Sequence, residues 1–104
     1  MLDRYARLGV PLLVTENGIA TTDEALRLQF LREHLREARD AIRRGVPLLG
    51  YLHWTLMDNF EWSLGTRPRF GLLANEYRSQ TRTARPAAME LARICRSGRL
   101  PETG

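Results

Sequence analysis

Two segments of the 104-residue sequence place acidic side chains where they could do chemistry. In the first, Thr15-Glu16-Asn17-Gly18, the carboxylate of Glu16 directly follows a short apolar run. The second begins at Trp54, ends at Trp62 and contains Glu61. Carboxylates beside aromatic rings favour glycoside hydrolysis, in which one carboxylate attacks the anomeric carbon and a second acid protonates the leaving oxygen. Sugars also stack on aromatic rings.

Neither segment is decisive when it is taken alone. A solvated carboxylate ahead of an Asn-Gly turn explains Glu16 as well as catalysis does. Trp54 and Trp62 could be core aromatics, but both lie beside acids where a strand is expected to end, and this position favours sugar binding. The interpretation of Glu16 as a nucleophile therefore depends on the second segment.

The elements expected to position these side chains form a βαβ unit. The apolar run from Val10 to Thr15 predicts a buried parallel strand, and the one from Val46 to Trp54 predicts another. Between them a helix is expected from Asp23 to about Gly45, opened by a Thr21–Glu24 capping box. Its predicted apolar face recurs at spacings of three and four: Leu28, Leu31, Leu35, Ala38 and Ile42.

Further elements are expected on both sides of this unit. A helix is predicted from Leu2 to Leu8, and a short hairpin from 70–73 and 77–83. A last helix should begin at Pro86 and end at Gly98. Its predicted apolar face includes Cys95, which is interpreted as a small buried hydrophobe without a functional role.

Because loops at the carboxyl ends of parallel strands form the binding surface, Glu16 and the segment from Trp54 should converge on one pocket. His53 alternates with Trp54 along the strand and is predicted to be a hydrogen-bonded core histidine. His34 is expected to be a solvated surface residue. Asp58 and the following asparagine are expected to hold their loop through local backbone hydrogen bonds.

Three consecutive motifs resemble the signatures of glycoside hydrolase family 1, which contains β-glucosidases and β-galactosidases. They are Thr15-Glu16-Asn17-Gly18-Ile19, then the segment from Gly50 to Trp62, then Arg69-Phe70-Gly71-Leu72. The resemblance implies an α/β fold, a partial (β/α)₈ TIM barrel made of the last two strand–helix units. Residues 1–104 would then be the carboxy-terminal part of the catalytic barrel.

The resemblance also implies a role for individual residues. Glu16 matches the covalent nucleophile of the retaining mechanism. Trp54 matches the aromatic platform under the sugar, Glu61 the carboxylate that accepts hydrogen bonds from two sugar hydroxyls, and Trp62 an indole donor to a neighbouring hydroxyl. Phe70 matches a wall of the same pocket. The implied substrate is a β-glucoside or a β-galactoside.

One half of the implied mechanism is missing from the sequence. The family places its acid/base glutamate in an Asn-Glu-Pro motif, and no such tripeptide occurs here. We therefore expect the chain to be inactive alone and to need the missing part of the barrel. The alternative is a noncatalytic carbohydrate-binding remnant, which keeps Trp54, Glu61 and Trp62 without the chemistry.

Composition excludes several other functions. The 16 basic residues are all arginine and give a net charge of +4, which could indicate a nucleic-acid partner. However, the arginines of the long helix alternate with acids, so a solvated surface is favoured.

The sequence shows no membrane span and no signal peptide, so cytoplasmic localisation is expected. It shows no metal ligands and no phosphate-binding glycine loop, so no cofactor is implied.

Overall fold

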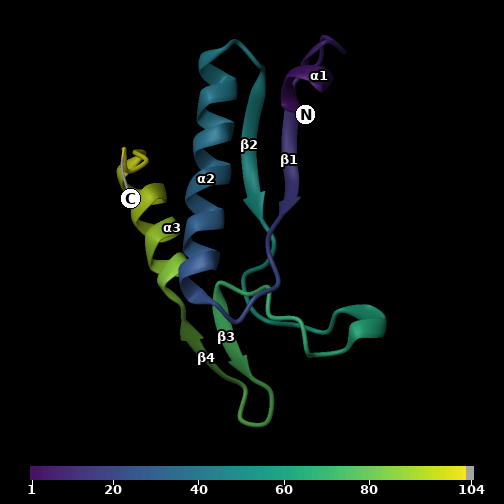
Figure 1. Ribbon diagram of the computed structural model, residues 1–104, viewed down its shortest axis with the longest axis vertical. Coiled ribbons are helices and arrows are strands. Elements are labelled where there is room, and N and C mark those ends of the chain that lie inside the picture. Colours follow the sequence, from purple (N-terminus) through teal and green to yellow (C-terminus); the bar gives the residue numbers. More distant parts are fainter. Residues whose placement is uncertain (103–104) are drawn as a thin grey trace.

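The computed structural model describes residues 1–102, which form a βαβ unit followed by a hairpin and a helix (Figure 1). The elements in chain order are α1 (Leu2–Ala6), β1 (Leu12–Asn17), α2 (Glu24–Arg43), β2 (Leu48–His53), the 3₁₀ helix η1 (Trp62–Leu64), β3 (Leu73–Glu76), β4 (Thr81–Ala84) and α3 (Pro86–Ser97). The two predicted strands pair in parallel, and β3 pairs with β4 in a hairpin, as predicted, but both hairpin strands begin later than the predicted 70–73 and 77–83.

Strand β1 begins and ends two residues later than the apolar run that predicted it. Pairing with β2 continues to Asn17, which lies opposite His53, and the backbone N–H of Trp54 donates to the Asn17 carbonyl at 2.9 Å. Glu16 therefore lies inside β1 and not after it. The prediction ended the strand too early because backbone pairing does not require apolar side chains.

The start of α2 differs from the predicted capping box. Asp23 is the N-cap, and its Oδ1 accepts from the Leu26 N–H at 3.1 Å. The Thr21 hydroxyl instead accepts from the Asp23 N–H at 3.0 Å, just outside the helix. Aspartate and threonine are both favoured as N-cap residues. Asp23 is the N-cap here because its backbone has the extended conformation that is typical of this position.

Two clusters of buried side chains make the core. In one, α2 packs against the βαβ sheet through Ala38, Ala41, Val46 and Leu48. In the other, Leu31 of α2 packs against Leu72 and Ala87, at the start of α3. The structure exposes Ile42 and Cys95, so both were wrongly predicted to be buried; Ala41 and Ala87 occupy the core positions instead.

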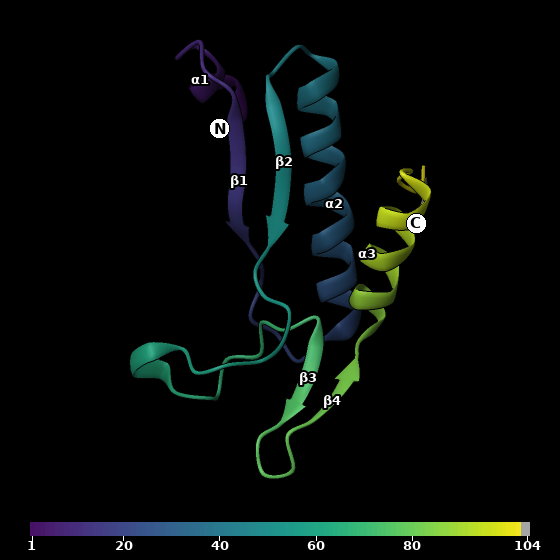
Figure 2. The same cartoon turned by 180° about the vertical axis from the view of Figure 1, so that it is seen from behind.

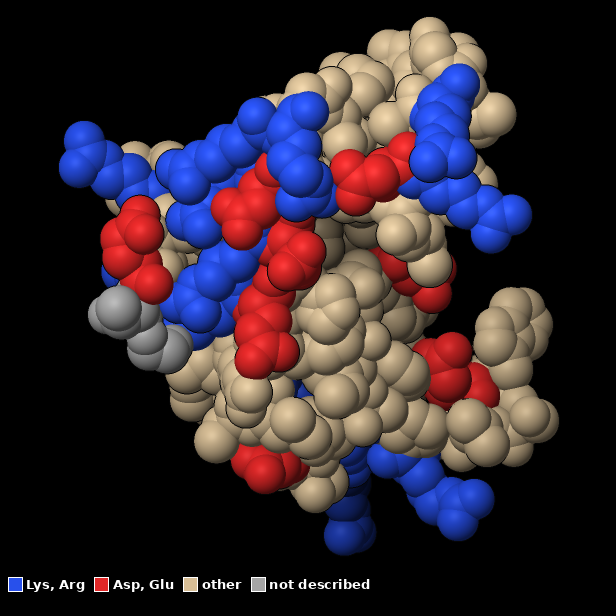
Figure 3. All heavy atoms as spheres, turned by 45° about the horizontal axis from the view of Figure 1, so that its top comes forward, with Lys and Arg blue, Asp and Glu red and all other residues tan. Residues whose placement is uncertain are grey.

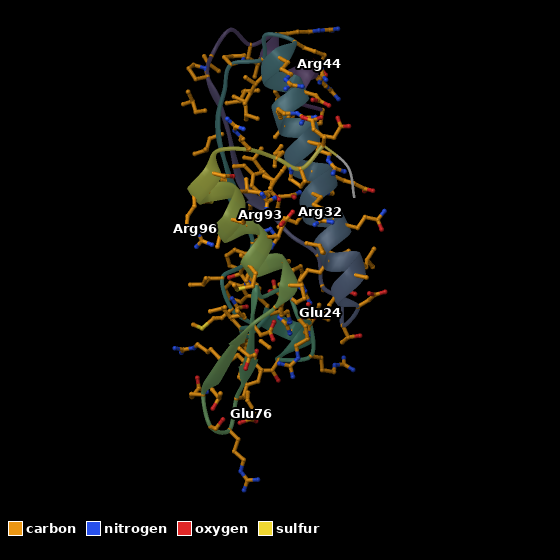
Figure 4. The ribbon with its side chains drawn as sticks, turned by 90° about the vertical axis from the view of Figure 1, so that its left-hand side faces the viewer. Glu24, Arg32, Arg44, Glu76, Arg93 and Arg96 are labelled. Atoms are coloured by element: carbon orange, nitrogen blue, oxygen red, sulfur yellow. The ribbon has the colours of Figure 1, made fainter. Side chains whose placement is uncertain are left out.

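Helices α2 and α3 lie on one side of the β1–β2 sheet (Figures 1 and 2). An ion pair across them joins Arg32 Nε to Glu90 Oε1 at 2.9 Å, and Arg93 pairs with the same glutamate (Figure 4). On the sheet face turned away from α2, Leu13, Leu49 and Leu52 are 50%, 74% and 53% exposed. The two strands thus leave one apolar face and two edges open among the described residues.

Basic and acidic side chains alternate over the end of the molecule shown in Figure 3. Arg44, for example, pairs with Asp3 at 3.0 Å, and Arg43 lies 3.9 Å from Asp40. This arrangement agrees with the interpretation of a solvated helix surface. Among residues 1–102, no helix is both long enough and apolar enough to cross a membrane.

We expect the isolated chain to self-associate or to form a molten state, because its strand edges and one apolar sheet face lack partners. Light scattering after size exclusion, combined with a thermal melt followed by circular dichroism, tests this expectation. A monomer that melts in one sharp cooperative transition would contradict it.

Candidate active site

The carboxyl ends of β1 and β2 lie side by side. The hydrogen bond from the Trp54 N–H to the Asn17 carbonyl joins them at backbone level. A side chain at Gly18 would overlap the Trp54 carbonyl, so this approach requires glycine at that position. The structure therefore places Glu16, the last but one residue of β1, and Trp54, directly after β2, at neighbouring strand ends.

Glu16 is exposed and lines an open cavity of about 420 Å³ on the α2 side of the sheet. Asn17 and Tyr51 line the same cavity, and the Tyr51 hydroxyl donates to Asn17 Oδ1 at 2.6 Å. Burial raises the pKa of Tyr51 to about 12, so its hydroxyl keeps its proton at neutral pH. This hydrogen bond orients Asn17, the residue next to Glu16.

Glu61 and Trp62 lie on an arm between β2 and β3. The arm projects on the side away from α2 and α3 (Figures 1 and 2). The Glu61 N–H donates to the Gly65 carbonyl at 2.7 Å, which closes the tip of the arm around η1. Trp62 is 83% exposed and has a φ of 45°, a conformation that L-residues other than glycine rarely adopt. A strained, exposed tryptophan is typical of a binding position.

The structure does not assemble the predicted pocket in full. Trp54 and Phe70 are half-buried, and neither lines the cavity that Glu16 lines. Glu61 and Trp62 do not line that cavity either. Convergence of Glu16 with these four side chains therefore stays a prediction.

Asp58, in the loop that carries Glu61, is buried and forms the centre of a hydrogen-bonded cluster that the sequence did not predict. Arg85 donates from both terminal nitrogens to the two carboxylate oxygens, at 2.9 Å each. The backbone N–H groups of Gly71 and Asn75 donate to the same oxygens at 2.9 and 3.3 Å, and Arg69 lies 3.4 Å away. The prediction of local hydrogen bonds was wrong, because these partners lie 11 to 27 residues along the chain.

Burial alone would raise the pKa of Asp58. The hydrogen bonds from Arg85 and from the two backbone N–H groups outweigh that effect and hold the pKa below its ordinary value. The same pairing raises the pKa of Arg85. Asp58 is therefore a charged, fully paired anchor and not an acid available for catalysis.

Arg27 of α2 extends this anchor to the loop after Glu16. Its guanidinium donates to the carbonyls of Ile19 and Thr21 in that loop, and to the Arg69 carbonyl, at 2.9 Å, beyond the arm. Glu24, near the lower end of α2 in Figure 4, pairs with Arg27 at 3.4 Å and with Arg85 at 3.1 Å. We call these five residues the arginine–carboxylate cluster: Glu24, Arg27, Asp58, Arg69 and Arg85.

Both histidines differ from their predictions. The two ring nitrogens of His53 are buried without a hydrogen-bond partner among residues 1–102, so His53 is not hydrogen-bonded as expected. Burial, together with the nearby charge of Arg27, lowers the pKa of His53 to about 4. His34 is half-buried, with its ring centroid 3.8 Å from that of Phe30, and is not simply solvated.

Comparison with known sequences identifies the class of protein to which this fold and site belong. The sequence profile of Glycosyl hydrolase family 1 matches residues 1–98, and the chain belongs to this family. It is 42% identical over 102 residues to a β-galactosidase of Sulfolobus acidocaldarius, covering 98% of this chain and 21% of that protein. It is 40% identical to a galactolipid galactosyltransferase of Arabidopsis thaliana, covering 94% of this chain and 16% of that protein.

Solved structures show the same relationship. A β-glycosidase from Pyrococcus horikoshii superimposes with a TM-score of 0.94 at 40% identity, over 97% of this chain and 24% of that one. The fold is therefore a part of a (β/α)₈ barrel that comprises its last two strand–helix units, as the sequence predicted. The chain spans between about a sixth and a quarter of the length of these relatives.

Replacing Asp58 with asparagine should strongly destabilise the fold, because Arg85 would then lose its carboxylate partner in a buried site. We expect a cost of about 3–5 kcal/mol in the free energy of unfolding. Urea unfolding can be measured in a chimera in which residues 1–104 replace the matched segment of the Sulfolobus acidocaldarius enzyme. Asp3→Asn, which breaks an exposed aspartate–arginine pair, is the matched control and should shift the midpoint far less. Equal shifts in the two variants would contradict the anchoring role of Asp58.

His53 should make the fold sensitive to mild acid. The folded-state pKa of about 4 lies below the ordinary value of 6.5, so the unfolded chain takes up a proton where the folded chain does not. This contribution to stability is complete above pH 6.5 and is lost as the pH falls towards 4. Unfolding midpoints of the chimera should therefore decrease with acidification more steeply than those of its His53→Phe variant. Parallel pH profiles would contradict the assignment.

Proposed function

We propose that residues 1–104 supply the nucleophile and one wall of the sugar pocket of a retaining β-glycosidase. The observation that supports this most directly is the position of Glu16 and Trp54 at adjacent strand ends, within a chain of Glycosyl hydrolase family 1. Residues at the carboxyl ends of barrel strands carry the chemistry in this fold. Relatives named β-galactosidase and β-glucosidase support a β-glucoside or a β-galactoside as the substrate.

In the proposed mechanism, the Glu16 carboxylate attacks the anomeric carbon and the glycosidic C–O bond breaks, the leaving oxygen taking a proton from an acid/base carboxyl. Water then hydrolyses the glycosyl ester, giving its proton back to that carboxyl and releasing Glu16 as a carboxylate. A strand position suits this step because the reach and angle of the nucleophile must be held closely. Trp54 lies under the sugar ring, while Glu61 and Trp62 bind its hydroxyls and Phe70 closes one side. A site that hydrogen-bonds particular hydroxyls discriminates strongly against sugars that lack them.

The acid/base carboxyl of the proposed mechanism lies outside these residues. Retaining hydrolysis places the two carboxyl groups about 5–5.5 Å apart, and the sequence contains no Asn-Glu-Pro motif that could supply the second one. We therefore propose that the chain alone does not turn over glycosides and that it needs the remaining barrel units. Its cytoplasmic localisation stays a prediction.

A noncatalytic carbohydrate-binding remnant is the second candidate. The galactosyltransferase among the relatives also indicates that family members can pass a sugar to an acceptor other than water. Both hydrolysis and transfer use the same nucleophile and differ in the acceptor. Covalent trapping of Glu16 therefore separates catalysis from simple binding, whichever acceptor is used.

Incubation of the chimera with a 2-deoxy-2-fluoro glucoside carrying a good leaving group should add one sugar mass to Glu16. The fluorine slows breakdown of the ester, so the adduct accumulates and peptide mass spectrometry locates it. Glu16→Gln should abolish the adduct and lower turnover of an aryl glucoside by about 10⁴-fold or more.

The isolated chain should show no turnover of the same aryl glucoside. If the chimera binds glucose but Glu16 remains unlabelled, the binding remnant is the correct interpretation. If the isolated chain shows turnover that Glu16→Gln abolishes, the proposed need for further barrel units is wrong.

A further inference from the structure

The β3–β4 hairpin borders a second cavity, which shares no lining residue with the cavity beside Glu16. The hairpin projects beyond the carboxyl ends of β1 and β2 (Figure 1). The cavity has a volume of about 320 Å³, and small-molecule sites usually have roughly 300–1,000 Å³. Its lining combines hairpin residues with three members of the arginine–carboxylate cluster: Asp58, Arg69 and Arg85.

Asn75 of β3 leaves one hydrogen-bond acceptor unused at this cavity. Its side chain is only 7% exposed, and its amide nitrogen donates to the Asp58 carbonyl at 3.5 Å. Its Oδ1 is also buried, but has no hydrogen-bond partner among residues 1–102. A buried carbonyl oxygen costs free energy unless a donor reaches it. A group that binds in this cavity should therefore donate a hydrogen bond.

Tyr77, two residues further along the chain, leaves a hydroxyl unused at the same cavity. The hydroxyl is buried and lacks a partner in the part of the chain that the structure describes. Arg69 holds the ring, because its guanidinium carbon lies 5.3 Å from the ring centroid. Thr83, exposed on β4, lines the cavity with a further hydroxyl. Each of these two hydroxyls can both donate and accept.

The charged groups that line the cavity are already paired. Asp58 accepts from Arg85 and lies 3.4 Å from Arg69, while Glu76 accepts from two backbone N–H groups of the hairpin turn at 3.2 and 2.6 Å. Two carboxylates and two guanidinium groups leave no net charge in the lining. An anion has no proton to donate to Asn75 Oδ1, and a cation finds no unpaired carboxylate. The groups that remain available therefore favour a neutral ligand.

We propose that this cavity binds a neutral sugar or polyol through adjacent hydroxyl groups. One ligand hydroxyl donates to Asn75 Oδ1, and its neighbour forms hydrogen bonds with the hydroxyls of Tyr77 and Thr83. Hydroxyl groups suit all three partners, because each can donate and accept. No step of this binding involves Glu16, so the site is independent of the proposed function.

The test uses the chimera labelled with 3-fluorotyrosine, in which fluorine NMR reports on the tyrosine rings. Tyr77→Phe identifies the Tyr77 resonance by its loss, and Tyr5→Phe identifies that of Tyr5, which is 50% exposed on α1. Methyl β-glucoside and sorbitol are titrated separately. We expect at least one of them to shift the Tyr77 resonance saturably while the Tyr5 resonance stays unchanged. The probe that saturates shows whether the site takes a ring-form sugar, an open-chain polyol or both.

Asn75→Leu should weaken this binding by at least about tenfold, because it removes the buried acceptor. Since Asn75 is buried beside Asp58, a second variant, Thr83→Val, removes a hydroxyl at an exposed position where the fold is not at risk. Its affinity should fall by about three- to tenfold. Thr22→Val is the matched control, at an exposed threonine outside the cavity, and its affinity should stay within about twofold.

If neither probe shifts the Tyr77 resonance, the proposal is overturned and ordered water is the partner of the two buried atoms. A titration that Thr83→Val leaves unchanged would overturn it too, and so would one that Glu61→Ala abolishes, because the response would then come from the proposed active site. Labelling of Glu16 is a separate readout. A Tyr77 response without a Glu16 adduct supports this site and contradicts the proposed function, whereas an adduct without a Tyr77 response does the reverse.

Discussion

The buried carboxylate of Asp58 is the constraint on which the rest of the site depends. Its two oxygens accept hydrogen bonds from both terminal nitrogens of Arg85 and from the backbone N–H groups of Gly71 and Asn75. A charge taken out of water is tolerated only when it is fully paired in this way. The loop after β2 therefore has one arrangement in which Asp58 is satisfied, and that arrangement sets where the arm with Glu61 begins.

The arginine–carboxylate cluster carries this constraint to the loop after β1. Arg27 donates to backbone carbonyls on both sides, at Ile19 and at Arg69, so the two loops that bear the proposed site residues share one support. Buried ion pairs add little net stability compared with apolar packing, but they strongly penalise other geometries. The cluster thus fixes the positions of the two loops, while the core around Leu31 supplies the apolar burial.

The sequence predicted those features that depend on local pattern or on shared motifs. The parallel βαβ unit, the hairpin and the helix from Pro86 to Gly98 follow from apolar periodicity and from turn residues, and the structure contains all of them. The Asp58–Arg85 pair was missed because its members are 27 residues apart, and no periodicity links them. Arg27 was missed because a fully buried arginine on a helix is rare and is recognisable only through the carbonyls that surround it.

A crystal structure of the chimera with bound glucose tests the central claim, that the cluster brings two separate strand ends to one sugar. The account predicts glucose stacked on Trp54, with the Glu16 carboxylate facing the anomeric carbon and Glu61 accepting hydrogen bonds from two hydroxyls. Asp58 should remain bound to Arg85 beneath the loop. A glucose bound elsewhere, or a Glu16 carboxylate directed away from the anomeric carbon while the cluster is intact, would contradict the account.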